Sequence, residues 1–138
     1  MKLKCQYASA SEAGDEIFQV LFREREEQED GPYVLVQRAW LEEDEGEFSP
    51  IYVETHNEDL IGHYPKVEAI LTRNQFILKL PPPASETIEV DFNADDRNFQ
   101  ELRRMIGIIL QKDLKKEEER NANNVLNRTV DPAGSTSG

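Results

Sequence analysis

The segment from residue 54 to residue 63 holds the first side chains whose types could do chemistry. Imidazole and carboxylate groups are ligands for transition metals and can also transfer protons. The residues are Glu54, His56, Glu58, Asp59 and His63. A zinc site needs at least three converging ligands, and the spacing between the two histidines matches no zinc signature. We interpret this segment as a polar strand and loop with solvated imidazoles, and we expect no metal site.

A nucleophile, a calcium site and a cofactor loop are also not expected. Cys5 has no neighbouring base to activate it, and a single cysteine excludes an internal disulfide. Asp91, Asp95 and Asp96 are too few for a calcium loop, and the capping of a helix explains them. No glycine-rich phosphate loop or nucleophile elbow occurs. The sequence therefore predicts a protein that is not an enzyme and has no cofactor.

The charge of the chain favours a basic protein as its partner. The 138 residues include 28 acidic and 16 basic side chains, which gives a net charge of −12. This charge argues against nucleic acid and anionic membranes, whose phosphates are bound by clustered Lys and Arg. No apolar segment is long enough to span a bilayer, and no signal-peptide core follows the first residues. We expect a cytoplasmic protein, and the single cysteine agrees with a reducing compartment.

Two acidic runs bracket the apolar segment 33–40. Carboxylates repel one another, so both runs must lie in solvated loops. Solubility is the ordinary explanation of such runs, and contact with a partner is the alternative. In a simple meander they would lie at opposite ends of the strand. The candidate partner-binding residues are the acids Glu42, Glu43, Asp44, Glu45 and Glu47, then Glu26, Glu27, Glu29 and Asp30, with Phe48, Tyr64 and Trp40 as aromatic anchors.

Apolar periodicity predicts mainly strands, followed by one helix. The expected strands are 16–23, 33–40, 50–55, 66–72, 75–80 and 87–92. A helix over 16–29 is the alternative for the first of these. A helix capped by Asn93 or Asp95 follows, and its apolar stripe comprises Phe99, Leu102, Ile106, Ile109 and Leu110. Gly107 lies beside the stripe, where we expect a close approach to the sheet.

These elements predict an α+β fold. The gaps between strands are too short for crossover helices, so the strands should form an antiparallel meander-like sheet of about six strands. The C-terminal amphipathic helix should pack on one face of that sheet. We expect one domain over residues 1–118 and a flexible tail over 119–138.

Several motifs follow one another over roughly residues 16–112. They are the aromatic and aliphatic strand 32–38 ending in Gln-Arg, an acidic loop, the strand 51–54, Gly62, the hairpin 67–80, the strand 88–92 and the helix through Leu102. The order of these motifs resembles the tenth immunity-protein family of bacterial polymorphic toxin systems.

The resemblance implies a bacterial cytoplasmic protein that binds and neutralises a cognate toxin domain by blocking it. It supplies no catalytic residue. The expected partner is a basic toxin protein, and the chain would be a monomer or a dimer. The alternative is another acidic binding module, such as a secretion chaperone or adaptor, which would be indicated by a stable helix over residues 11–29.

Overall fold

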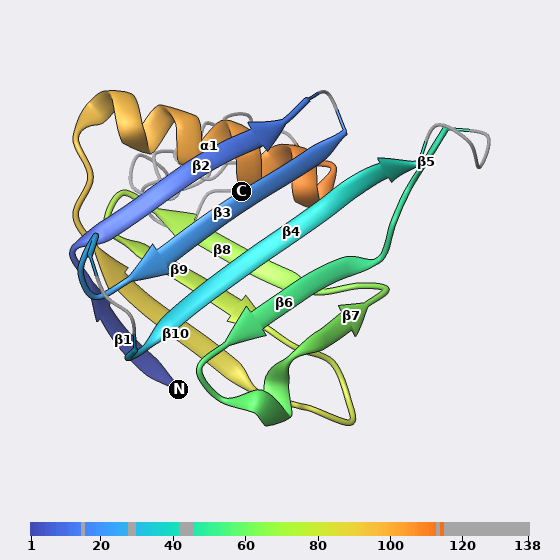
Figure 1. Ribbon diagram of the computed structural model, residues 1–138, viewed down its shortest axis with the longest axis horizontal. Coiled ribbons are helices and arrows are strands. Elements are labelled where there is room, and N and C mark those ends of the chain that lie inside the picture. The colour runs from blue at the N-terminus through green and yellow to red at the C-terminus, as the bar shows by residue number, and fades with distance from the viewer. Residues whose placement is uncertain (15, 28–29, 42–45, 113, 115–138) are drawn as a thin grey trace, which may run out of the picture.

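The chain folds into two layers that share one hydrophobic core (Figure 1). The computed structural model describes residues 1–14, 16–27, 30–41, 46–112 and 114. The expected tail, residues 119–138, lies outside this part, and the single domain over 1–118 stays a prediction. The elements are β1 (Lys2–Cys5), β2 (Tyr7–Ala13), β3 (Ile17–Arg23), β4 (Tyr33–Leu41), β5 (Glu47–Phe48), β6 (Ile51–Thr55), the short 3₁₀ helix η2 (Glu58–Leu60), β7 (Gly62–Tyr64), β8 (Glu68–Thr72), β9 (Gln75–Lys79), β10 (Thr87–Phe92) and α1 (Asp96–Leu110).

The strands form two sheets rather than one. Sheet B has the order β2-β3-β4-β6-β7, with β5 paired to the end of β4. Its neighbouring strands are antiparallel. Sheet A has the order β1-β10-β9-β8, in which β1 runs parallel to β10 and the other pairs are antiparallel. The α+β class is confirmed, and sheet B is the expected meander-like sheet.

The sequence predicts that the hairpin and the last strand extend that meander. They instead form sheet A. The reason is the apolar face that each set of strands carries, because stacking two such faces buries both. The ring of Phe22 in sheet B lies 5.2 Å from that of Phe76 and 5.4 Å from that of Phe92, both in sheet A. The alternation predicted for residues 88–92 is also confirmed, since Ile88 and Val90 are fully buried.

The first two strands carry the weakest sequence signals. The sequence of β2 is small and polar, yet β2 pairs with β3 along its whole length, from Tyr7 opposite Arg23 to Ala13 opposite Ile17. An edge strand needs few apolar side chains of its own when the neighbouring strand is apolar and forms the backbone hydrogen bonds with it. The pairing also shows that residues 17–23 form a strand, so the alternative helix over 16–29 is wrong.

Helix α1 packs against β2 and β3 and lies beside sheet A in the second layer (Figure 1). Asp95 caps the helix, accepting a hydrogen bond from the Asn98 N–H at 2.7 Å. The predicted stripe is buried except for half-buried Leu110, and Met105 joins it. The Asn98 side-chain amide donates to the Ala8 carbonyl at 2.8 Å, and Arg104 forms an ion pair with Glu12. These contacts cover the outer edge of β2.

The C-terminal end of α1 turns back on itself. Gln111 adopts a left-handed conformation (φ 57°), and the N–H of Lys112 donates to the Gly107 carbonyl at 2.9 Å. A Cβ at Gly107 would lie 2.8 Å from the Lys112 carbonyl oxygen. The close approach that requires Gly107 is therefore made by this turn, and our expectation of an approach to the sheet was wrong.

Candidate partner-binding surface

The outer face of sheet B is the face directed away from sheet A and α1, and none of the described elements covers it (Figure 1). Strand register sets three rows of side chains across it. The first row is Tyr7, Arg23, Tyr33 and His56, the second is Ser9, Leu21, Leu35 and Glu54, and the third is Ser11, Gln19, Gln37, Tyr52 and His63. Half-buried Leu21 and Leu35 thus lie between two polar and aromatic rows. An apolar centre inside a polar rim is typical of protein interfaces, in which Tyr and Arg are enriched.

This face is hollowed near the loop between β3 and β4. The hollow has a volume of about 740 Å³ and is open to solvent. Its lining comprises Gln19, Leu21, Arg23, Asp30, Gly31, Tyr33, Leu35, Glu54 and His56. The lining residues come from three neighbouring strands and two loops, so the surface can receive a protruding side chain of another protein.

Two tyrosines hold the carboxylate of Glu54 in the hollow. The Tyr33 hydroxyl donates to Oε2 at 2.8 Å, and the Tyr52 hydroxyl donates to Oε1 at 2.7 Å. Burial raises the pKa of Tyr33 to about 12, and the hydrogen bond and the charge of Glu54 add to this effect. The hydrogen bond to Glu54 is the main cause of the raised pKa of Tyr52. Both phenols therefore remain neutral donors at physiological pH.

The two histidines of the sequence motif lie on this face but have separate surroundings. Nδ1 of His56 accepts a hydrogen bond from the Tyr33 backbone N–H at 3.2 Å. The His63 ring lies 5.1 Å from that of Tyr52. Within the part of the chain that the structure describes, no three His, Cys, Asp or Glu side chains gather in a way that could hold a metal ion.

Among the described residues that line the hollow, Arg23 is the one Arg or Lys, and the imidazole of His56 also lines it. The guanidinium carbon of Arg23 lies 4.7 Å from the centre of the Tyr7 ring, on the β2 side of the sheet. Its Nε atom is buried and has no hydrogen-bond partner among the described residues. Sequence reasoning missed Arg23, Tyr33, Tyr52 and the two leucines. The signal that could have found them is alternation, because they alternate with the buried residues along β3, β4 and β6.

The acidic candidates divide between the two ends of β4. Glu26, Glu27 and Asp30 are exposed in the loop beside the hollow, and Asp30 lines it. Glu47 is exposed at the other end, next to Phe48. Nine residues of strand separate these ends, a length of about 27 Å. Glu29 and the four acids Glu42, Glu43, Asp44 and Glu45 lie outside the described residues.

The predicted aromatic anchors take part in packing within the fold. The ring centres of Phe48 and Trp40 lie 4.8 Å apart, and the guanidinium carbon of Arg38 lies 5.2 Å from the centre of the Phe48 ring. The Tyr64 hydroxyl donates to the Leu60 carbonyl at 2.7 Å. All three aromatic side chains remain half-buried, so each keeps some surface that a partner could contact.

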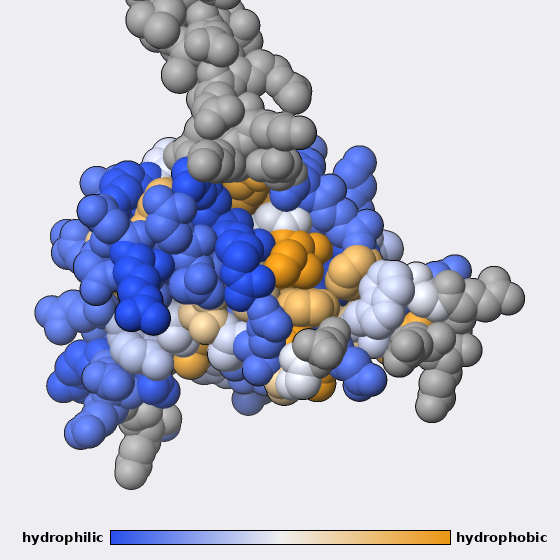
Figure 2. All heavy atoms as spheres, turned by 90° about the horizontal axis from the view of Figure 1, so that it is seen from above, coloured by the Kyte–Doolittle hydropathy of each residue, from blue (hydrophilic) through white to orange (hydrophobic). Residues whose placement is uncertain are grey.

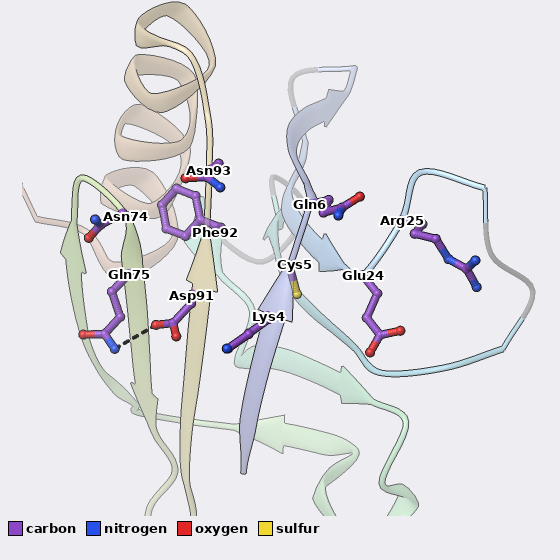
Figure 3. Close-up of a pocket in the computed structure, with 10 residues that line it drawn as sticks. All are labelled: Lys4, Cys5, Gln6, Glu24, Arg25, Asn74, Gln75, Asp91, Phe92 and Asn93. Carbon is purple, nitrogen blue, oxygen red and sulfur yellow. Dashed lines mark hydrogen bonds between the residues drawn. The ribbon is translucent and has the colours of Figure 1, made fainter.

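A second hollow, of about 730 Å³, lies where β1 ends (Figure 3). Its lining is mainly polar, and a hydrogen bond from the Gln75 amide to Asp91 crosses part of it. Cys5 lies at this place, and burial raises the pKa of its thiol to about 11, with the charge of Glu24 adding to the effect. A thiol with this pKa is protonated at neutral pH and is a poor nucleophile.

The helix side of the molecule is mainly hydrophilic. Figure 2 shows this face, on which a small apolar patch is set among polar and charged residues. A hollow of about 620 Å³ on α1 is lined by Ile108 and Leu114 together with charged side chains. Among the described residues, no helix has both the length and the apolar character to cross a membrane.

Comparison with known proteins gave no match: no family model, no curated protein and no solved structure is significantly similar to the chain.

Proposed function

We propose that this chain is an immunity protein that binds a cognate bacterial toxin domain and neutralises it by occlusion, without catalysis. The toxin would present a basic surface. A cytoplasmic location and the absence of a cofactor belong to the same proposal. The motif order that resembles the tenth immunity-protein family supplies the class of partner.

One observation carries the binding role. The outer face of sheet B has half-buried leucines at its centre, tyrosines and an arginine around them, and an acidic loop at its rim. Tyr and Arg are the residues that most often dominate the binding energy of interfaces, and a paired sheet presents them rigidly. The chain as a whole carries a charge of −12, which would raise the rate of encounter with a basic partner.

The natural partner to test is the C-terminal domain of a secreted toxin encoded beside this chain. We expect the purified chain to form a 1:1 complex with that domain and to abolish its activity at stoichiometric concentration. A neighbouring toxin domain that neither binds the chain nor loses activity would contradict the proposal.

A pair of matched variants tests whether the outer face of sheet B is the contact surface. Leu35→Arg places a bulky charge at the centre of this face, and Ile77→Arg makes the same type of change on the outer face of sheet A. Leu35→Arg should weaken the complex by about a hundredfold or more, because central interface residues dominate binding energy. Ile77→Arg should leave the complex intact. Equal effects of the two variants would place the contact elsewhere.

The secretion chaperone receives no specific support. We had expected such a chaperone to show a stable helix over residues 11–29. The described residues of that range instead include the end of β2 and all of β3.

A further inference from the structure

We infer that Glu54 is the anchoring site for an arginine side chain of the protein partner. The guanidinium would bind the Glu54 carboxylate in the hollow of sheet B, between Tyr33 and Tyr52. The inference rests on the proposed function for the identity of the protein that carries the arginine, but not for the chemistry of the site.

The Glu54 carboxylate is already oriented for a two-point contact. Each of its oxygens accepts one phenolic hydrogen bond, from Tyr33 at 2.8 Å and from Tyr52 at 2.7 Å. A carboxylate has about four acceptor positions, so each oxygen can accept a further donor. The planar fork of a guanidinium donates two parallel hydrogen bonds to such a group, whereas an ammonium is a point charge. Because the tyrosines already restrict the carboxylate, binding would cost little side-chain entropy.

The surroundings of Glu54 suit the apolar part of an arginine side chain. Leu35 lies directly opposite Glu54 in the strand register, and Leu21 lies opposite Leu35. Side chains at opposed positions are about 5 Å apart at Cβ. The methylene groups of an arginine could therefore cover Leu35 while its head reaches Glu54. The rings of Tyr33 and Tyr52 add surfaces that attract a cation.

The charges around the hollow also favour a cation. Asp30 lines the hollow, and Glu26 and Glu27 are exposed in the same loop. The one Arg or Lys among the described lining residues, Arg23, stacks on Tyr7 in β2, and Nδ1 of His56, which also lines the hollow, accepts a hydrogen bond from the Tyr33 N–H. Two strand spacings separate β3 from β6, which is about 10 Å. Arg23 is thus directed away from Glu54 and leaves the carboxylate accessible to a guanidinium from the partner.

The test uses the peptide acetyl-Ala-Arg-Ala-amide and two counterparts in which lysine or citrulline replaces arginine. Binding to the full chain is followed by chemical shifts of backbone amides in NMR spectra. We expect saturable shifts at Tyr33, Leu35 and Glu54 with the arginine peptide, weaker binding of the lysine peptide and none of the neutral citrulline peptide. Glu54→Gln keeps the size of the side chain but removes its charge, and it should weaken binding at least tenfold.

Glu89→Gln is the matched control, because Glu89 is a half-buried glutamate on the outer face of sheet A. It makes the same change in net charge and should leave binding unchanged. Equal binding of the arginine and citrulline peptides, equal affinity of Glu54→Gln and the unmodified chain, or the absence of saturable shifts would each overturn the inference. If Glu54→Gln inhibits the toxin domain as well as the unmodified chain does, the inference fails while the proposed function stands. If the arginine peptide binds as expected but no toxin is inhibited, the proposed function fails alone.

Discussion

At the scale of single residues, the thiol of Cys5 should be chemically inert. Its pKa of about 11 compares with an ordinary value of 9.0, so the thiolate fraction at pH 8 is about a hundredfold smaller in the folded chain. We expect Ellman's reagent to modify the folded protein at least about a hundred times more slowly than the unfolded protein. Similar rates in the two states would show that the thiol is neither buried nor shifted.

Tyr33 should be among the last phenols of the chain to ionise. Its pKa is about 12 in the folded state against 10.0 ordinarily, so folding favours the neutral form. This contribution to stability is present below pH 10 and is lost as the pH rises through 12. An absorbance titration of tyrosinate should lose a step near pH 12 in Tyr33→Phe. Glu54→Gln should lower the pKa of Tyr33 only in part, since burial is the largest cause. An unchanged titration in Tyr33→Phe would contradict the assignment.

At the scale of the elements, Arg38 links sheet B to the end of α1. Its Nη1 donates to the Ile109 carbonyl at 2.7 Å, and its Nε donates to the Ser49 carbonyl at 2.7 Å. Hydrogen bonds from a charged donor contribute about 1.5–3 kcal/mol each. We expect Arg38→Met to lower the free energy of unfolding in urea by about 2 kcal/mol or more. Arg97→Met, at an exposed position in the first turn of α1, should change it by less than about 0.5 kcal/mol. Equal effects would show that Arg38 does not hold the helix.

The turn after α1 reverses the usual preference for alanine over glycine in a helix. Gly107→Ala would ordinarily stabilise a helix by about 1 kcal/mol. Here the added Cβ would lie 2.8 Å from the Lys112 carbonyl oxygen, so we expect a loss of stability. Gln111→Gly should instead stabilise the chain by up to about 1 kcal/mol, because Gln111 is left-handed at φ 57°. Thermal unfolding checks both signs, and a stabilising Gly107→Ala would show that the turn yields easily.

The local sequence pattern was enough to identify most of these elements, but it did not show which strands pair or which sheets pack together. Alternation predicted the strand with Ile88 and Val90, and spacing predicted the stripe of α1, because each signal lies within a few residues. The parallel pairing of Leu3 with Val90 depends on contacts distant in sequence. The division into two sheets likewise depends on how Phe22 meets Phe76, and no local pattern encodes that contact.

At the scale of the whole molecule, charge should govern the rate of association. Glu26→Lys with Glu27→Lys reverses charge beside the hollow, and Glu68→Lys with Asp91→Lys makes the same change on the outer face of sheet A. We expect the first pair to slow association with the toxin domain by about tenfold and to flatten its salt dependence, with little change in dissociation. Reversal of Glu42 to Glu45 tests the other acidic run in the same way. If the pair on sheet A slows association equally, overall charge rather than this loop steers the encounter.

The candidate surface was only partly predictable from sequence. The acidic runs are visible as consecutive residues, and their separation by β4 followed from the strand between them. The group of Tyr33, Tyr52 and Glu54 was not visible, because it forms only when the registers of β4 and β6 are known. A surface built across strands has no signature along the chain.

The parallel pairing of β1 with β10 constrains how the protein is made. Residues 2–5 are synthesised before residues 87–92, the strand on which they align. Leu3 and Cys5 therefore lack the strand that they pair with until residues 87–92 have been synthesised. A truncated product that stops just before β10 would retain the strands of sheet B but lack β10 and α1, which cover much of its inner face, and it would be a substrate for chaperones and proteases.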